Sequence, residues 1–287
     1  MGNPLCIGLE LPALPVWVAA SAGRRSVSPR SPVVQAAWHA ADAAVEAGAT
    51  CVWFADARRP GAAPACDPCT LAAAFAHRRR GALVGVAATF PHGRAPAVLA
   101  RDVSTLDVLS GGGAAVLLRW EDEGGCDYLA EAAQVCRAVF REPSPVFEGR
   151  HVHVAGAVNR PAPIQPGGPP IVVDLPQAGG SATLARLLTW ATAVVCSGAP
   201  DAVGAWRVRL DRLAPPHAGR PALLYRHVLD VLEGERAAPA HAARDAGADG
   251  VVLRLALARL PSGGAPKDNG YDALVRAVTE LVRPWQC

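Results

Sequence analysis

A turn in front of a helix-like stretch is the first feature of this sequence that suggests chemistry. Residues 177–181 read QAGGS and lie between an apolar run at 171–175 and a Leu- and Ala-rich stretch at 182–191. Backbone N–H groups at the start of a helix bind anions, and glycines let an anion come close to them. We therefore predict a phosphate site whose contacts are Gln177, Gly179, Gly180 and Ser181. The alternative is an ordinary turn in which Ser181 caps the helix.

Two carboxylates stand just beyond apolar runs. Glu121 follows Trp120, after the run at 114–118, and Asp56 comes directly after the run at 49–55. A carboxyl group buried beside an aromatic ring has a raised pKa and can donate a proton near neutral pH. We predict Glu121 as a general acid and Asp56 as a second catalytic or polar contact. A solvated acidic loop at Glu121 and a structural hydrogen bond at Asp56 are the alternatives.

The composition argues against several other chemistries. Lysine and arginine number 28 against 25 aspartates and glutamates, and the longest basic run is 78–80, so we expect no nucleic-acid partner. Lys267 is the only lysine, and its Gly- and Pro-rich surroundings are a poor place to desolvate an amine, which disfavours Schiff-base catalysis. Ser110 and Ser197 lack the surroundings of an activated nucleophile, which disfavours hydrolysis.

Neither metal binding nor membrane insertion is predicted. Cys66 and Cys69 have zinc-knuckle spacing, but no second ligand pair follows at a matching distance. His151 and His153 share one face of a β-like stretch without a visible third ligand. The first residues show no signal-peptide pattern, and no run of about 18 apolar residues occurs. We expect a cytoplasmic protein with reduced thiols.

Short apolar runs alternate with stretches of helical spacing along the 287 residues. Runs that are apolar on both faces, each followed by a helix, indicate a parallel sheet covered by helices. The number of runs, about eight, predicts one α/β domain at 1–287, folded as a (β/α)8 TIM barrel. An open doubly wound sheet is the alternative, although no Gly-rich fingerprint follows the first run. The predicted strands are 5–11, 49–55, 82–89, 114–118, 171–175, 193–197, 223–228 and 250–255, and the clearest helices are 32–47, 69–79, 95–109, 128–140 and 182–191.

Residues 141–170 interrupt this alternation. They contain seven prolines and a β-like HVHV at 151–154, which predicts a small hairpin inserted between a helix and the next barrel strand. Long insertions on barrels often act as lids, and we expect this one to cover a substrate. The stretches 212–221 and 261–270 have the composition of loops.

Four blocks resemble the bacterial-luciferase-like superfamily of flavin-dependent and coenzyme F-420 (deazaflavin)-dependent enzymes. The third block resembles the family pattern LAR-x-x-x-TLD-x-LS-x-GR, and the fourth resembles F-x-G followed by P-x-P-x-Q-x-x-PP. Their order and spacing are specific, and the resemblance covers roughly residues 1–200. The blocks are EAGA at 46–49 with Ala55-Asp56, GVAATFPHGRAP at 85–96, LARDVSTLDVLSGGG at 99–113, and FEGRHVHV to RPAPIQPGGPP at 147–170.

The third block also follows the logic of an amphipathic helix. Ser110 and the glycines after it are expected to end this helix. Five apolar residues fall at helical spacing and are expected to face the barrel: Val98, Leu99, Val103, Leu106 and Leu109.

The resemblance implies roles for further residues. In deazaflavin relatives a non-prolyl cis peptide backs the cofactor ring at the positions of Ala87, Ala88 and Thr89, so these residues are expected to contact the ring. The family grips the cofactor phosphate near 177–181. This sequence departs from the family where Ala57 replaces a histidine and where VLLR at 116–119 replaces a glycine-rich stretch.

The leading hypothesis is a luciferase-like oxidoreductase that transfers a hydride between a reduced deazaflavin (F-420) or flavin and a small organic substrate. F-420 is favoured over FMN because the arginine-rich composition is typical of GC-rich actinobacterial genomes. Two alternatives are a degenerate barrel that serves as a non-redox biosynthetic enzyme or binding protein, and an FMN-dependent monooxygenase. The resemblance leaves a homodimer open, and Arg254 is a further candidate for a phosphate contact.

Overall fold

The computed structural model shows a closed barrel of parallel strands. It describes residues 7–11, 32–56, 65–79, 81–91, 94–120, 125–175, 180–214, 220–229, 238–255 and 279–280. Around the barrel the strands follow the order β1-β10-β9-β8-β7-β4-β3-β2, and the predicted (β/α)8 barrel is confirmed. The barrel strands are β1 (Ile7–Leu11), β2 (Cys51–Ala55), β3 (Leu83–Phe90), β4 (Ala114–Trp120), β7 (Ile171–Asp174), β8 (Ala193–Cys196), β9 (Ala222–Leu229) and β10 (Gly250–Leu255).

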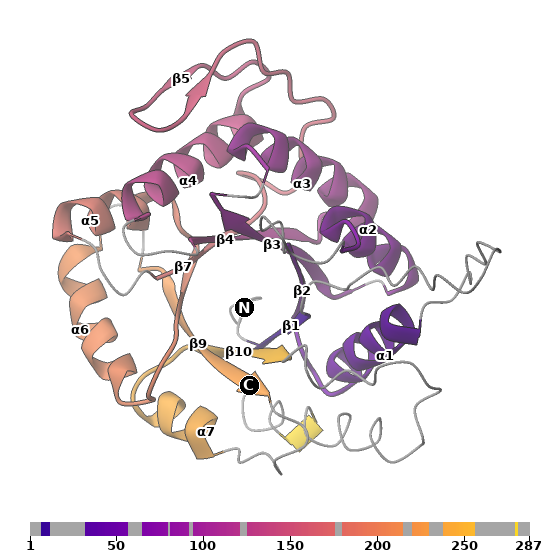
Figure 1. Ribbon diagram of the computed structural model, residues 1–287, viewed down its shortest axis with the longest axis vertical. Helices are drawn as coiled ribbons and strands as arrows, with labels where there is room; N and C mark the ends of the chain where they lie inside the picture. Colours follow the sequence, from indigo (N-terminus) through magenta and orange to yellow (C-terminus); the bar gives the residue numbers. More distant parts are fainter. Residues whose placement is uncertain are drawn as a thin grey trace, which may run out of the picture.

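Helices surround this barrel on the outside, as Figure 1 shows. The five predicted helices all occur, with ends shifted by one or two residues. Helices α6 and α7 were not among them, and α6 includes the first two residues of the predicted loop at 212–221; the predicted loop at 261–270 lies outside the described residues. The helices are α1 (Pro32–Glu46), α2 (Pro68–Arg78), α3 (Pro96–Ser110), α4 (Cys126–Arg141), α5 (Ser181–Trp190), α6 (Ala202–Leu213) and α7 (Ala238–Asp245). No helix within the described ranges is long and apolar enough to cross a membrane.

The inside of the barrel is filled around one large side chain. Trp53 on β2 is 1% exposed and belongs to an interior cluster of apolar residues contributed by seven of the barrel strands. Glycines on the two neighbouring strands make room for its indole. A methyl group at Gly85 would lie 2.1 Å from Trp53 Cε3, and one at Gly8 would lie 2.9 Å from its Nε1. These glycines are therefore required by close approach of the ring.

Helix α3 carries the sequence block on which the family resemblance mainly depends. It begins with Pro96 and ends at Gly111, whose φ of 73° is the left-handed conformation that glycine adopts easily. Leu99, Val103 and Leu106 are buried, as predicted. The prediction was wrong for Val98 and Leu109, which are 42% and 62% exposed because they lie off the buried stripe of the helix.

The two most specific sequence blocks contact each other through Asp107. Its carboxylate is fully buried and accepts the backbone N–H groups of Ile164 and Gln165 at 2.7 and 2.9 Å. The Gln165 side-chain amide donates to Asp107 and to the carbonyl of Ala114, at 2.6 and 2.7 Å. The TLD motif and the P-x-P-x-Q motif therefore form one hydrogen-bonded joint.

The insertion at 141–170 contains the predicted hairpin, formed by β5 (Phe147–Glu148) and β6 (His153–Val154). Figure 1 shows it outside helices α3 and α4. Glu131 on α4 accepts the backbone N–H groups of Arg150, His151 and Val152 at 2.8–2.9 Å. The expectation of a lid over the barrel mouth is corrected, because these contacts fasten the segment to the outer surface.

Candidate functional site

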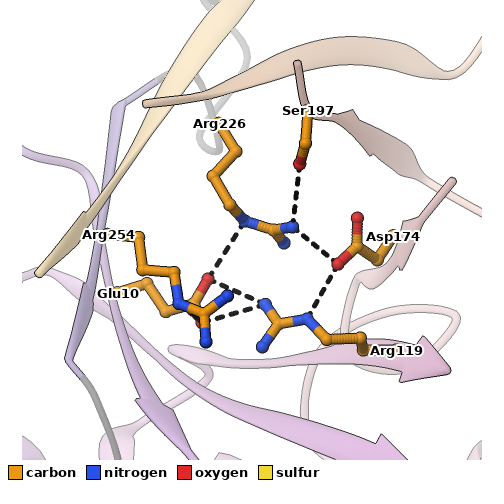
Figure 2. Close-up of polar contacts among 6 residues, drawn as sticks. All are labelled: Glu10, Arg119, Asp174, Ser197, Arg226 and Arg254. Carbon is orange, nitrogen blue, oxygen red and sulfur yellow. Dashed lines mark hydrogen bonds and ion pairs between the residues drawn. The ribbon is translucent and has the colours of Figure 1, made fainter. Parts of the chain in front are cut away.

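One layer of polar side chains crosses the barrel near the carboxyl ends of its strands. Side chains two residues apart in a strand lie on the same face. Leu117, for example, belongs to the interior cluster, so Arg119 projects inward one layer further along β4. We call this layer the mouth cluster. It consists of Glu10, Arg119, Asp174, Ser197, Arg226 and Arg254 (Figure 2).

Arg119 is the link between the two acids of the mouth cluster. One Nη atom lies 2.9 Å from both carboxylate oxygens of Glu10, and its Nε donates to Asp174 at 2.7 Å. Glu10 is fully buried and Arg119 is nearly so. Burial by itself would raise the pKa of Glu10, but the charges of Arg119, Arg226 and Arg254 together hold that pKa below its ordinary value.

Arg226 is held on one side and unsatisfied on the other. Its Nη1 donates to Asp174 at 2.6 Å and to the Ser197 hydroxyl at 3.0 Å. Its Nε lies 3.4 Å from Glu10, too poorly aligned for a hydrogen bond. Among the described residues, neither Nε nor Nη2 of Arg226 has a hydrogen-bond acceptor, although both atoms are buried. Buried donors of this kind are rare and call for a partner.

Arg254 gives the mouth cluster an excess of positive charge. Three guanidinium groups face the two carboxylates of Glu10 and Asp174, as Figure 2 shows. Arg254 Nε lies 3.5 Å from Glu10, and its side chain is 42% exposed. Burial and the neighbouring charges of Arg119 and Arg226 lower the pKa of Arg254, while Glu10 opposes them. An added anion would relieve this repulsion.

A pocket of about 560 Å³ opens beside these arginines, at the ends of β8, β9 and β10. Arg226 and Arg254 both line it, together with Ser197 and Gly198. Its volume lies within the range of about 300–1,000 Å³ typical of small-molecule sites. In the described part of the chain, no group of three or more His, Cys, Asp or Glu side chains could hold a metal ion.

The three residues predicted to back a cofactor ring do not share one face. Ala87 belongs to the interior cluster, whereas Ala88 belongs to the core between the sheet and the helices. Alternation then turns Thr89 inward with Ala87. The cis peptide bonds in the described residues are Phe90–Pro91 and Arg160–Pro161, so the non-prolyl cis bond expected at 87–89 is absent there. β3 instead continues its regular pairing with β4 through this stretch.

Asp56 lies at the carboxyl end of β2, and its backbone N–H donates to Ala87 at 2.8 Å. The side chain is nearly buried. Burial raises the pKa of the Cys69 thiol, at the start of α2, to about 12, and the charge of Asp56 adds to that shift. Asp56 is therefore close to the α2 start, while its catalytic role stays a prediction.

The predicted phosphate turn is described only in part. Gly180 is the N-cap of α5 and Ser181 its first residue, and both are exposed. Ser181 is therefore not the cap that the alternative interpretation required. Gln177 and Gly179 lie outside the described residues, as does Glu121.

Sequence reasoning missed most of the mouth cluster. Glu10, Asp174 and Arg226 were not singled out, and Arg119 was noted only as a bulky departure from the family. A signal was available for Glu10 and Asp174, because each is the single charged residue near the end of an apolar strand, in IGLEL and in IVVD. A charge in a strand that is buried on both faces needs a partner of opposite charge.

Solved structures of redox enzymes share this fold along nearly the whole chain. The coenzyme F-420-dependent tetrahydromethanopterin reductase from Methanopyrus kandleri has a TM-score of 0.67 and 16% identity, covering 98% of this chain and 99% of that chain. An F-420-dependent secondary alcohol dehydrogenase in complex with an F-420–acetone adduct has a TM-score of 0.66 and 13% identity, covering 96% and 99%. A monooxygenase from Streptomyces bottropensis has a TM-score of 0.65 and 16% identity, covering 97% and 99%.

The likeness to these structures, at 13–16% identity, confirms the predicted (β/α)8 barrel fold. No family model and no curated protein sequence matches the chain. One fold hosts many activities, and the residues of the site rather than the fold determine which activity a barrel has.

Proposed function

We propose that this protein is an oxidoreductase that binds a deazaflavin (F-420) or a flavin at the barrel mouth and acts on a small organic substrate. The observation that carries the proposal is the mouth cluster, with its excess of one positive charge and its unsatisfied guanidinium group. The proposal also draws on the fold shared with F-420-dependent enzymes and a monooxygenase.

The donors of the mouth cluster fit this type of cofactor. Flavins and deazaflavins carry ring carbonyls, ring nitrogens and a phosphate, all of which accept hydrogen bonds. Arg226 has unused buried donors, and Arg254 is accessible from the pocket. These two residues would hold an acceptor-rich group, and the cofactor would supply the hydride.

The charge of the mouth cluster would favour one redox state. A hydride that is transferred to an oxidised ring brings negative charge with it, and a fixed positive charge nearby stabilises that added charge. Arg119 is itself fixed by Glu10 and Asp174, so its charge is already oriented before a ligand arrives. We therefore expect the protein to bind the reduced cofactor more tightly than the oxidised one.

Titration of the purified protein with F-420 and with FMN tests this function. We expect saturable changes in fluorescence or absorbance at micromolar concentrations, and a midpoint potential above that of the free cofactor. Arg226→Gln should reduce the rise in potential, whereas Arg186→Gln, an exposed arginine on α5, should not. The proposed function is disproved if the fluorescence and absorbance of both cofactors stay unchanged, in the oxidised and in the reduced state.

A second candidate is a barrel that binds a metabolite without redox chemistry. It is favoured by the position of Arg119, whose guanidinium crosses the barrel between Glu10 and Asp174 at the level where the family resemblance implies glycine (Figure 2). If Arg119 blocks the ring, Arg119→Gly should gain cofactor affinity. Under the leading proposal the same variant should lose it.

A further inference from the structure

Two arginines, Arg226 and Arg254, line the pocket beside β8, β9 and β10. Ser197 also lines it, and its hydroxyl group accepts from Arg226 at 3.0 Å. The pocket thus combines an arginine that is only 6% exposed with one that is 42% exposed. The first is held in place, and the second is available to a ligand.

The two carboxylates of the mouth cluster do not provide close hydrogen-bond acceptors for all donors of Arg226 and Arg254. Glu10 gives both its oxygens to Arg119, at 2.9 Å each, and approaches Arg226 and Arg254 only at 3.4 and 3.5 Å. Asp174 is shared between Arg119 and Arg226. The partly exposed guanidinium of Arg254 therefore has no close oxyanion of its own, whereas the unpaired Nε and Nη2 of Arg226 are buried and would act on a ligand through their positive charge.

We propose that this pocket binds the carboxylate or phosphate group of the organic substrate, with Arg254 as the main contact and Arg226 as its support. Guanidinium groups suit both anions because they can donate two parallel hydrogen bonds. The proposal rests on the proposed function only in calling the ligand a substrate. The inference that the pocket binds an anion depends on Arg226 and Arg254 alone.

The pocket is assigned to a substrate anion because the cofactor phosphate is predicted to bind elsewhere. The turn predicted to hold the cofactor phosphate leads into α5, after β7, whereas the pocket lies beyond β8 and next to α7 through Pro239. The cofactor phosphate and the substrate anion would then bind at separate places in the protein. An oriented substrate needs a fixed contact, and the buried Arg226 beside the accessible Arg254 provides one.

Calorimetric titration without cofactor tests the anion pocket directly. Inorganic phosphate and succinate would be compared at constant ionic strength with succinamide, which has a similar shape and no charge. We expect saturable binding of at least one anion and none of succinamide. Arg254→Gln should raise the dissociation constant at least tenfold, and Arg186→Gln should leave it within twofold.

Comparison of the two anions identifies the anionic group of the substrate. Tighter binding of phosphate would indicate a phosphate group, and tighter binding of succinate would indicate a carboxylate. The pocket is disproved if neither anion binds, or if Arg186→Gln weakens binding as much as Arg254→Gln, which would indicate a general charge effect.

A competition experiment separates this proposal from the proposed function. If the anion displaces F-420 or FMN, the pocket holds the cofactor phosphate and the substrate assignment is wrong. If cofactor and anion bind together, the assignment is supported. If the anion binds while neither cofactor does, the redox function fails and the anion pocket survives.

Discussion

Two buried polar networks in this barrel differ in how completely they are satisfied. On the outer side, Asp107 and Glu131 accept backbone N–H groups of the insertion at 141–170, and each carboxylate oxygen has a donor. At the barrel mouth, Arg226 keeps two buried nitrogens without acceptors among the described residues. One network closes on itself, and the other leaves donors for something else.

This difference separates architecture from function in a single molecule. A fully satisfied network gives rigidity, and leaving a buried donor unpaired costs free energy. Such a cost is offset at sites where a ligand supplies the missing partner. The outer network therefore explains the recurring sequence blocks, while the mouth cluster is the better place to look for activity.

The largest effect is expected from Arg119→Met. This change leaves Glu10, which is fully buried, without its two hydrogen bonds and removes one from Asp174. Breaking a buried ion pair on one side costs about 3–5 kcal/mol of unfolding free energy. Urea denaturation measures it. The double variant with Glu10→Gln should recover part of the loss, and a single-variant loss below about 1 kcal/mol would mean that the mouth cluster is not coupled.

Glu131→Gln should cost less, about 2 kcal/mol, because an amide NH2 group, which only donates, replaces one of the two oxygens that accept the three backbone N–H groups. Glu142→Gln, an exposed residue that follows α4, is the matched control and should change the unfolding free energy little. Anion and cofactor binding should be unaffected in both. If Glu131→Gln changed ligand binding and Glu142→Gln did not, the outer network would not be purely structural, which would contradict the distinction between the two networks.

A smaller effect is expected from low pH, which should reduce the stabilisation that Glu131 gives to the outer network. Burial opposes ionisation of Glu131, but three backbone N–H groups hold its pKa below the ordinary value of 4.5. A lowered folded pKa means that this stabilisation is complete above about pH 4.5 and is lost as the pH falls through the folded value. Unfolding free energies measured from about pH 7 to pH 3 should fall more steeply for the wild type than for Glu131→Gln. Parallel curves would contradict this.

The smallest stability effect is expected from Arg254→Gln. Its guanidinium is partly exposed, and the other two arginines repel it. The unfolding free energy should change by less than about 1 kcal/mol, as for exposed ion pairs. A larger destabilisation in urea denaturation would assign Arg254 to the architecture and weaken the case for an available anion contact.

The fold was predictable from the sequence because its signals are local. The run at 250–255 is β10 without any shift, and the glycines after Ser110 end α3 as expected. The alternation of such runs with helices is enough to require a parallel sheet, and the family blocks then favour the barrel over the open sheet.

The site was predictable only in part because its partners are remote. Glu10 and Arg119 are 109 residues apart, and nothing local to IGLEL shows which cation neutralises its glutamate. Closing the barrel brings β1 beside β10 and places Glu10 level with Arg254. Ala87 and Ala88 face opposite sides of β3, and their contact with a cofactor ring stays a prediction.

The indole of Trp53, which lies against Gly8 and Gly85, limits how a ligand can reach the charged layer. It fills the axis of the barrel beneath the charged layer, together with the apolar side chains around it. A ligand of the charged layer could therefore not pass through the barrel, and it would have to enter and leave on the side where the carboxyl ends of the strands lie.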